Sequence, residues 1–189
     1  MASHLRAGPE YIEPSHPVQA AVKQAFEEMT GENSPGHGID GCSAPNFATS
    51  LAGLARAMAR MARPAGLGAV RAAAAVALVQ AMIAHPQLVA GVGKIDSELM
   101  SVMDGVAIKG GADGVYVAIL PKQGYGVALK IDDGAERAKN AAIAALLVHL
   151  GALEASHPVT RQWVNTVARN WRGFETGHVR TSPSFIQVA

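Results

Sequence analysis

The sequence of 189 residues contains little cysteine, few aromatic residues and little charge. Its single cysteine, Cys42, excludes an internal disulfide, which fits a reducing compartment. Charged residues make up 16% of the chain, against roughly 25% in an average globular protein, while 49% of the residues are hydrophobic. This deficit of charge predicts that part of the surface is covered by another segment or partner.

Long apolar runs and clusters of charge are also missing. The most apolar stretch, residues 72–84, is too short and too rich in alanine to span a bilayer, and the N-terminus has no apolar signal-peptide core. Lysine and arginine are scattered and the formal net charge is +1, so neither nucleic acid nor a membrane is an expected partner. Together with the lone cysteine, these features predict a soluble protein of the cytoplasm.

The length suits one domain with a sizeable core, and we expect residues 1–189 to form a single domain. The tetrapeptide Ser15-His16-Pro17-Val18 predicts a helix start, with Ser15 as the candidate N-cap and Gly31 as the end. Residues 31–47, rich in glycine, proline, asparagine and serine, predict a long loop. Loops of this length in a compact domain are usually functional or disordered.

Apolar periodicity predicts further helices before and after a group of strands. Helices are expected over residues 48–63, 67–85, 95–105 and 135–150, with 67–85 as a buried central helix, and a last helix through 163–167. Runs rich in Val, Ile and Tyr predict consecutive antiparallel strands over residues 105–111, 114–121 and 124–131. This order indicates a mixed α+β fold, an antiparallel sheet of about three or more strands covered by helices, and no Rossmann topology.

A search for complete catalytic motifs is mostly negative. No serine is followed by lysine three residues later, and G-x-S-x-G, H-E-x-x-H and a full phosphate-binding loop are absent from the 189 residues. Residues 91–94, Gly-Val-Gly-Lys, resemble a phosphate loop only in composition and predict a turn.

The residues alone leave two interpretations of Cys42 open. It is either a small buried apolar residue, as most free cysteines are, or a metal ligand or reactive thiol with Asp40 and His37 close by in the sequence. A zinc site needs about four donors. On the second interpretation, the other donors must come from elsewhere.

Lys109 also has two interpretations. It ends a predicted strand, and Gly110 and Gly111 would let a substrate approach the backbone closely, so that the lysine could lower the pKa of a nucleophile or stabilise negative charge. The alternative is a solvated lysine before a turn. Among other polar or aromatic residues, His16 and His157 are expected in helix caps, and Trp163 and Trp171 in packing rather than in a cofactor site.

Several separated segments together resemble a known family. They are residues 11–19 (YIEPSHPVQ), 38–45 (GIDGCSAP), 107–114 (AIKGGADG), 130–134 (KIDDG) and 170–173 (NWRG). In this order they are similar to the bacterial asparaginase II family, the Rhizobium etli type of L-asparaginase. The fold of that family is related to serine β-lactamases and glutaminases, so the resemblance implies part of that fold.

The resemblance implies hydrolysis of L-asparagine to L-aspartate and ammonia by a serine nucleophile that a lysine activates. It also implies a neighbouring zinc ion held by two cysteines and a lysine, and no organic cofactor. By position, Cys42 matches the second cysteine ligand, Asp40 matches a carboxylate beside the substrate, and Lys109 matches the active-site lysine of the strand. Gly110 and Gly111 match the substrate-binding backbone that follows this lysine.

The chain also departs from the family pattern. The Ser-x-x-Lys nucleophile motif, a second catalytic serine and the Cys-Ser-Gly-Lys motif with the other zinc ligands are not found in it. We therefore expect the C-terminal portion of an asparaginase II-like domain, with an incomplete zinc site and with a missing N-terminal half or a homodimer partner. On this account Cys42 should lie near Lys109 and open to solvent.

Two other functions stay open. One is a non-catalytic binding or interaction module with the same partial fold. The other is a serine β-lactamase-like amide hydrolase, because the K-x-G strand belongs to the whole superfamily.

Overall fold

The computed structural model describes residues 1–185, and its contacts divide the chain into two compact units, Met1–Ala57 and Met58–Ala189. Helices alternate with small antiparallel sheets in the described residues, which confirms the mixed α+β class. No helix within residues 1–185 is long and apolar enough to cross a bilayer. The single domain expected from the length stays a prediction.

The first unit contains two helices before its hairpin, α1 (Ala2–Leu5) and α2 (Pro17–Thr30). Helix α2 begins and ends where the sequence predicts, with the αL residue Gly31 as its C-cap. The N-cap, however, is His16 and not Ser15: the Val18 N–H donates to His16 Nδ1 over 3.1 Å. The choice of Ser15 was therefore wrong by one residue, because an imidazole nitrogen can accept the same hydrogen bond as a serine hydroxyl.

Residues 31–47 are not a plain loop. They contain two short antiparallel strands, β1 (His37–Ile39) and β2 (Pro45–Phe47), which pair from His37 opposite Phe47 to Ile39 opposite Pro45. Strands of three residues are too short to show a period of two in the sequence. Apart from the turn residues, the sequence therefore contained no pattern that predicts this hairpin.

The second unit is built on the three strands that the sequence predicts. They are β3 (Ala107–Gly110), β4 (Val115–Leu120) and β5 (Tyr125–Lys130), and they form one antiparallel sheet in the order β3-β4-β5. Its helices are the C-terminal part of α3 (Leu51–Ala62), α4 (Ala69–Ala84), α5 (Pro86–Ala90), α6 (Ile95–Val102), α7 (Glu136–His149) and α8 (Pro158–Val164).

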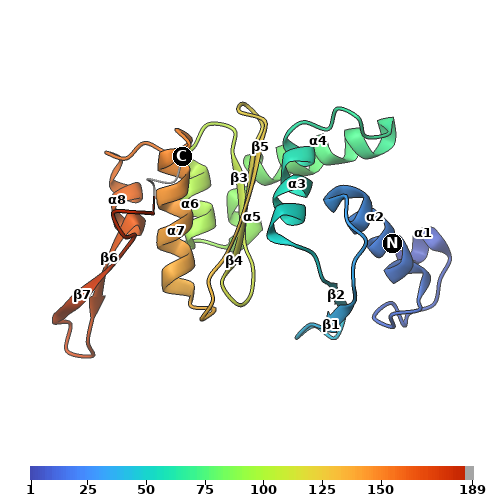
Figure 1. Ribbon diagram of the computed structural model, residues 1–189, viewed down its shortest axis with the longest axis horizontal. Helices are drawn as coiled ribbons and strands as arrows, with labels where there is room; N and C mark the ends of the chain where they lie inside the picture. The colour runs from blue at the N-terminus through green and yellow to red at the C-terminus, as the bar shows by residue number, and fades with distance from the viewer. Residues whose placement is uncertain (186–189) are drawn as a thin grey trace. The chain divides into compact units, whose positions relative to one another are not determined.

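The core of the second unit lies between the sheet and its helices. Helix α7 packs against β4 and β5, and α6 packs against β3 (Figure 1). The largest fully buried apolar and aromatic side chains of this core come from α6, β3, β4 and α7: Leu99, Ile108, Tyr116, Leu120, Ile143 and Leu147. The expected covering of the sheet by helices is therefore confirmed.

Helix α4 is not the buried central helix that its composition predicts. Only Ala75 and Val79 are buried, whereas Val70 is 87% and Leu78 is 58% exposed. Most of the apolar character of α4 comes from alanine, which tolerates solvent and favours helix without needing a core. High apolar content in this segment therefore did not mean burial.

The chain after α8 also differs from the prediction. The expected helix stops at Val164, and a hairpin of β6 (Asn165–Arg169) and β7 (Glu175–Arg180) follows it. Val167 therefore lies in a strand. Trp163 is half-buried against the core, as expected. Trp171 is in the turn that connects β6 to β7 and is fully exposed, so the prediction that it packs was wrong.

Candidate functional site

Asp40 and Cys42 lie in the turn of the β1–β2 hairpin. The Asp40 N–H donates to Ala44 O over 3.0 Å, and the Ser43 N–H donates to Asp40 O over 2.8 Å, with Ser43 at a φ of +69°. Both side chains are exposed, and the Cys42 thiol lies 3.5 Å from Asp40 Oδ2 as a hydrogen-bond donor. The exposed thiol agrees with the expectation for Cys42 and removes the buried-core interpretation.

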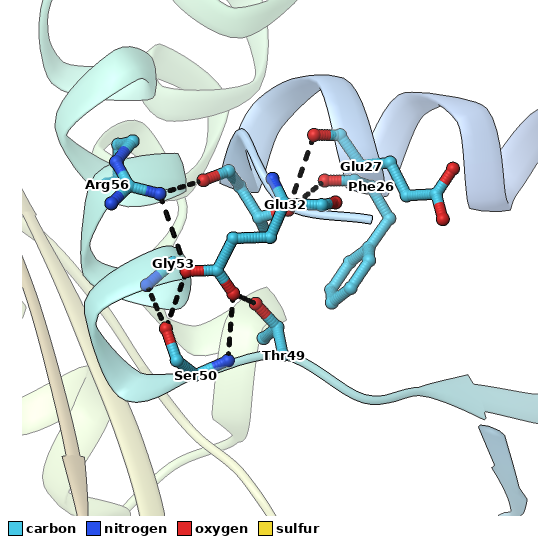
Figure 2. A network of polar contacts seen from close by, with 8 residues as sticks. Phe26, Glu27, Glu32, Thr49, Ser50, Gly53 and Arg56 are labelled. Carbon is cyan, nitrogen blue, oxygen red and sulfur yellow. Dashed lines mark hydrogen bonds and ion pairs between the residues drawn. The ribbon is translucent and has the colours of Figure 1, made fainter. Parts of the chain in front are cut away.

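Glu32 closes the base of the loop that carries this hairpin (Figure 2). Its Oε2 accepts hydrogen bonds from Thr49 Oγ1 at 2.8 Å and from the Ser50 N–H at 3.0 Å, and its Oε1 accepts from Ser50 Oγ at 2.6 Å. The Arg56 guanidinium lies 3.5 Å from Oε1. The hydrogen bonds from Ser50 and then Thr49, with a further contribution from Arg56, lower the pKa of Glu32 from 4.5 to about 2.

Lys109 lies near the end of β3, on the exposed edge of the strand, and is followed by Gly110 and Gly111. Two side chains from elsewhere bind the backbone of these glycines. Asp96 Oδ1 accepts from the Gly110 N–H over 2.7 Å, and Lys139 Nζ donates to Gly111 O over 2.7 Å. These contacts give the K-G-G segment a defined backbone conformation.

Lys109 lines a cavity of about 610 Å³ together with residues of α6, β4, α7 and α8. Asp96 and Tyr116 in its wall are buried, and burial followed by the charge of Asp96 raises the pKa of the Tyr116 phenol well above its usual range. Carboxylates of Asp96 and Glu136 lie in the same wall as the ammonium groups of Lys109 and Lys139. Such a mixture of charges can pair with both ends of a zwitterionic amino acid.

The structure places the predicted site residues in different units. Asp40 and Cys42 belong to Met1–Ala57, whereas Lys109, Gly110 and Gly111 belong to the second unit. The expected proximity of Cys42 and Lys109 stays a prediction.

The donors near Cys42 do not by themselves make a zinc site. Among residues 1–185, no group of three or more His, Cys, Asp or Glu side chains is arranged to hold a metal ion. Cys42 and Asp40 supply two donors where zinc takes about four. The described residues therefore do not fit a complete zinc site, and no chemical step is assigned to zinc.

Comparison with protein families shows which family the chain belongs to. A family model described as L-asparaginase II matches residues 1–181. The chain belongs to the L-asparaginase II family. A search of curated proteins found no match. Membership in the L-asparaginase II family confirms the resemblance at the level of the family and indicates an asparaginase-like function, hydrolysis of an amide in a small molecule.

Sequence reasoning missed four residues around these two sites: Glu32, Asp96, Tyr116 and Asn140. Asp96 carried one signal, since an acidic residue in the first turn is favourable at a helix start. That signal says nothing of Gly110, which Asp96 contacts from 14 residues away. Glu32 and Asp96 support the segments that the motifs identify, whereas Tyr116 and Asn140 line the cavity beside Lys109.

Proposed function

We propose that this chain supplies the substrate-binding loop and the K-G-G strand of a cytoplasmic L-asparaginase, which converts L-asparagine and water to L-aspartate and ammonia. The observation that carries the proposal is the match of the L-asparaginase II model over residues 1–181. The Asp40 turn and the Lys109 cavity support it, because both offer charged groups on accessible surfaces.

In the proposed site, Lys109 takes part in the chemistry and Asp40 orients the substrate. A lysine ammonium can stabilise the negative charge that develops on the amide oxygen during attack, and a carboxylate can pair with the substrate ammonium group. Gly110 and Gly111 follow Lys109 directly, and in this proposal the substrate binds beside this end of the strand.

The serine nucleophile of this proposal comes from residues other than these 189, since no Ser-x-x-Lys is present among them. The same outside segment would complete a zinc site around Cys42. We therefore propose that the isolated chain is inactive and that a segment with Ser-x-x-Lys and Cys-Ser-Gly-Lys restores hydrolysis.

Ammonia release from L-asparagine tests this function. The purified chain is assayed alone and mixed with a separately produced segment that carries both motifs from a longer family member. We expect turnover only in the mixture, and loss of that turnover in Lys109→Ala and Asp40→Ala. Lys122→Ala is the matched control, because Lys122 is an exposed lysine of the same sheet region that pairs with Asp104.

Two results would contradict the proposal: clear turnover by the chain alone, or a mixture whose activity does not depend on Lys109. The lack of Ser-x-x-Lys also favours a second proposal, a non-catalytic binding module. Binding of L-asparagine without turnover in the mixture would support that module. Acylation of the mixture by a labelled β-lactam would instead favour a β-lactamase-like amide hydrolase.

A further inference from the structure

The carboxylate of Glu32 joins the two ends of the loop that contains Asp40 and Cys42. Glu32 stands just after α2, and its hydrogen-bond donors Thr49 and Ser50 stand just before α3, 17 and 18 residues further along the chain. Hydrogen bonds to an ionised acceptor are roughly twice as strong as those between neutral groups. Three such bonds on one side chain therefore hold the two ends of the loop together.

Both flanking helices take part in this closure (Figure 2). At the end of α2, the buried Thr30 accepts a hydrogen bond at its Oγ1 from the Glu32 N–H over 3.4 Å. In α3, Arg56 donates to Thr30 O over 2.5 Å and pairs with Glu32. The backbone of Glu32 is thus bonded to the end of α2, while its carboxylate is held by Ser50 and Thr49 before α3 and by Arg56 in α3.

The local sequence leaves space for the carboxylate. Gly53 lies in the first turn of α3, and a Cβ atom there would come within 2.5 Å of Thr49 Oγ1 and 2.6 Å of the Glu32 carboxylate. Ser50 Oγ accepts from the Gly53 N–H over 2.9 Å and so also caps the start of α3. The same few residues therefore begin the helix and bind Glu32.

The hairpin above this closure has few bonds of its own. Its strands contain three residues each, β1 is exposed along its whole length, and a two-stranded hairpin is marginally stable in water. A further backbone bond, from the Ala48 N–H to Gly36 O at 2.9 Å, and a tilted contact between Phe47 and Phe26 hold its base. The turn conformation of Asp40 therefore depends on how firmly the base is closed.

We infer that Glu32 is a positioning residue, which holds the Asp40–Cys42 turn in one conformation by closing the base of its loop. This inference rests on the proposed function, in which Asp40 orients the substrate. Glu32 acts through Asp40 and touches neither substrate nor metal. Loss of its carboxylate would let the turn sample other conformations while the helices remain.

The first test uses the chain alone and the reaction of its single cysteine with an anionic disulfide reagent. Asp40 accepts a hydrogen bond from the thiol and its negative charge repels the reagent, so Asp40→Asn should raise the rate at Cys42 by about 2- to 10-fold. Glu32→Ala should raise it as well, by moving Asp40 away. In the double variant the rate should equal that of Asp40→Asn alone, because Glu32 acts through Asp40.

Glu10→Ala is the control for the loss of an exposed glutamate in the same unit. Glu32→Gln, which keeps an acceptor oxygen, should rescue part of the effect, and Thr49→Val provides a milder break if Glu32→Ala does not fold. An unchanged rate in Glu32→Ala and Thr49→Val, or independent effects that multiply in the double variant, would overturn the inference.

Hydrogen exchange gives an answer that does not involve the thiol. Glu32→Ala should speed exchange of the Asp40 and Ala48 amides by about tenfold or more, while the Ala118 amide in the sheet of the second unit keeps its rate. If the Asp40 and Ala48 amides exchange at the same rates in Glu32→Ala as in the native chain, the carboxylate does not order the loop.

The assay of the active mixture separates this inference from the proposed function. If the free-energy effects of Asp40→Ala and Glu32→Ala on asparagine hydrolysis add up in the double variant, the positioning role is wrong and the proposed function stands. If hydrolysis is indifferent to Asp40 and Lys109, the function is wrong, while the thiol and exchange experiments still decide whether Glu32 holds the turn.

Discussion

At the scale of single residues, the ionisation of Glu32 has the clearest measurable consequence. Its pKa is lowered from 4.5 to about 2, so its contribution to the folded state is present above pH 4.5 and is lost as the pH falls towards 2. We predict that the Glu32 carboxyl carbon titrates by NMR with a midpoint near 2. Ser50→Ala should move the midpoint upwards, because the Ser50 hydroxyl is the largest cause of the shift.

A Glu32 midpoint near 4.5 in the native chain would show that its hydrogen bonds do not persist in solution. Glu32→Gln should also remove part of the acid-induced loss of stability of the first unit between pH 4.5 and 2.

Gly53 gives a second prediction at this scale. Alanine normally stabilises a helix over glycine by about 1 kcal/mol. At residue 53 the new Cβ would meet Thr49 and Glu32 at 2.5 to 2.6 Å, so Gly53→Ala should destabilise the chain by about 1 kcal/mol in urea unfolding. In a Glu32→Ala background the same change should destabilise the chain less, because only the contact with Thr49 remains. An equal effect in both backgrounds would contradict the close approach of the carboxylate.

At the scale of elements, two helices begin with the same unusual cap. In both copies of Ser-His-Pro-Val the histidine Nδ1 accepts the N–H of the valine two residues later, at 3.1 Å for His16 and 3.2 Å for His157. We predict that His157→Ala destabilises the second unit by about 1 kcal/mol, while His157→Asn keeps most of the native stability. Ser156→Ala is the matched control from the neighbouring residue, and urea unfolding measures all three.

A loss in Ser156→Ala as large as that in His157→Ala would contradict the histidine cap. Ser156 instead donates to Glu154 Oε1 from its N–H over 3.2 Å and from its hydroxyl over 2.9 Å, and these two bonds, the N–H first, lower the pKa of that carboxyl. This contact is exposed, so its removal should have a small effect.

The elements also show where prediction from the sequence succeeds. The three strands of the sheet were predicted within about two residues, because each run of Val, Ile and Tyr is bounded by glycine or a charged turn. The β6–β7 hairpin was missed, because Val164 and Val167 are three residues apart and also fit a helix. Its tight turn depends on Asn170 Oδ1, which accepts from the N–H groups of Arg172 and Phe174.

At the scale of the whole molecule, stability of the second unit depends on the layer between α7 and the sheet. Leu147 is completely buried there. We predict that Leu147→Ala lowers the free energy of unfolding of this unit by about 2 to 5 kcal/mol. Leu88→Ala, at a residue 86% exposed, is the matched control and should change it by less than about 0.5 kcal/mol. Similar losses in the two variants would contradict this core.

The sequence by itself determined the α+β class, the order of most elements and the family, because periodicity, turn residues and motifs are all local in the chain. It also identified Asp40, Cys42 and Lys109 as candidates. Only the tertiary structure decided what supports them. Glu32 meets Thr49 and Ser50, and Asp96 meets Gly110, across 14 to 18 residues, and no local pattern predicts such contacts because the folding of the intervening chain creates them.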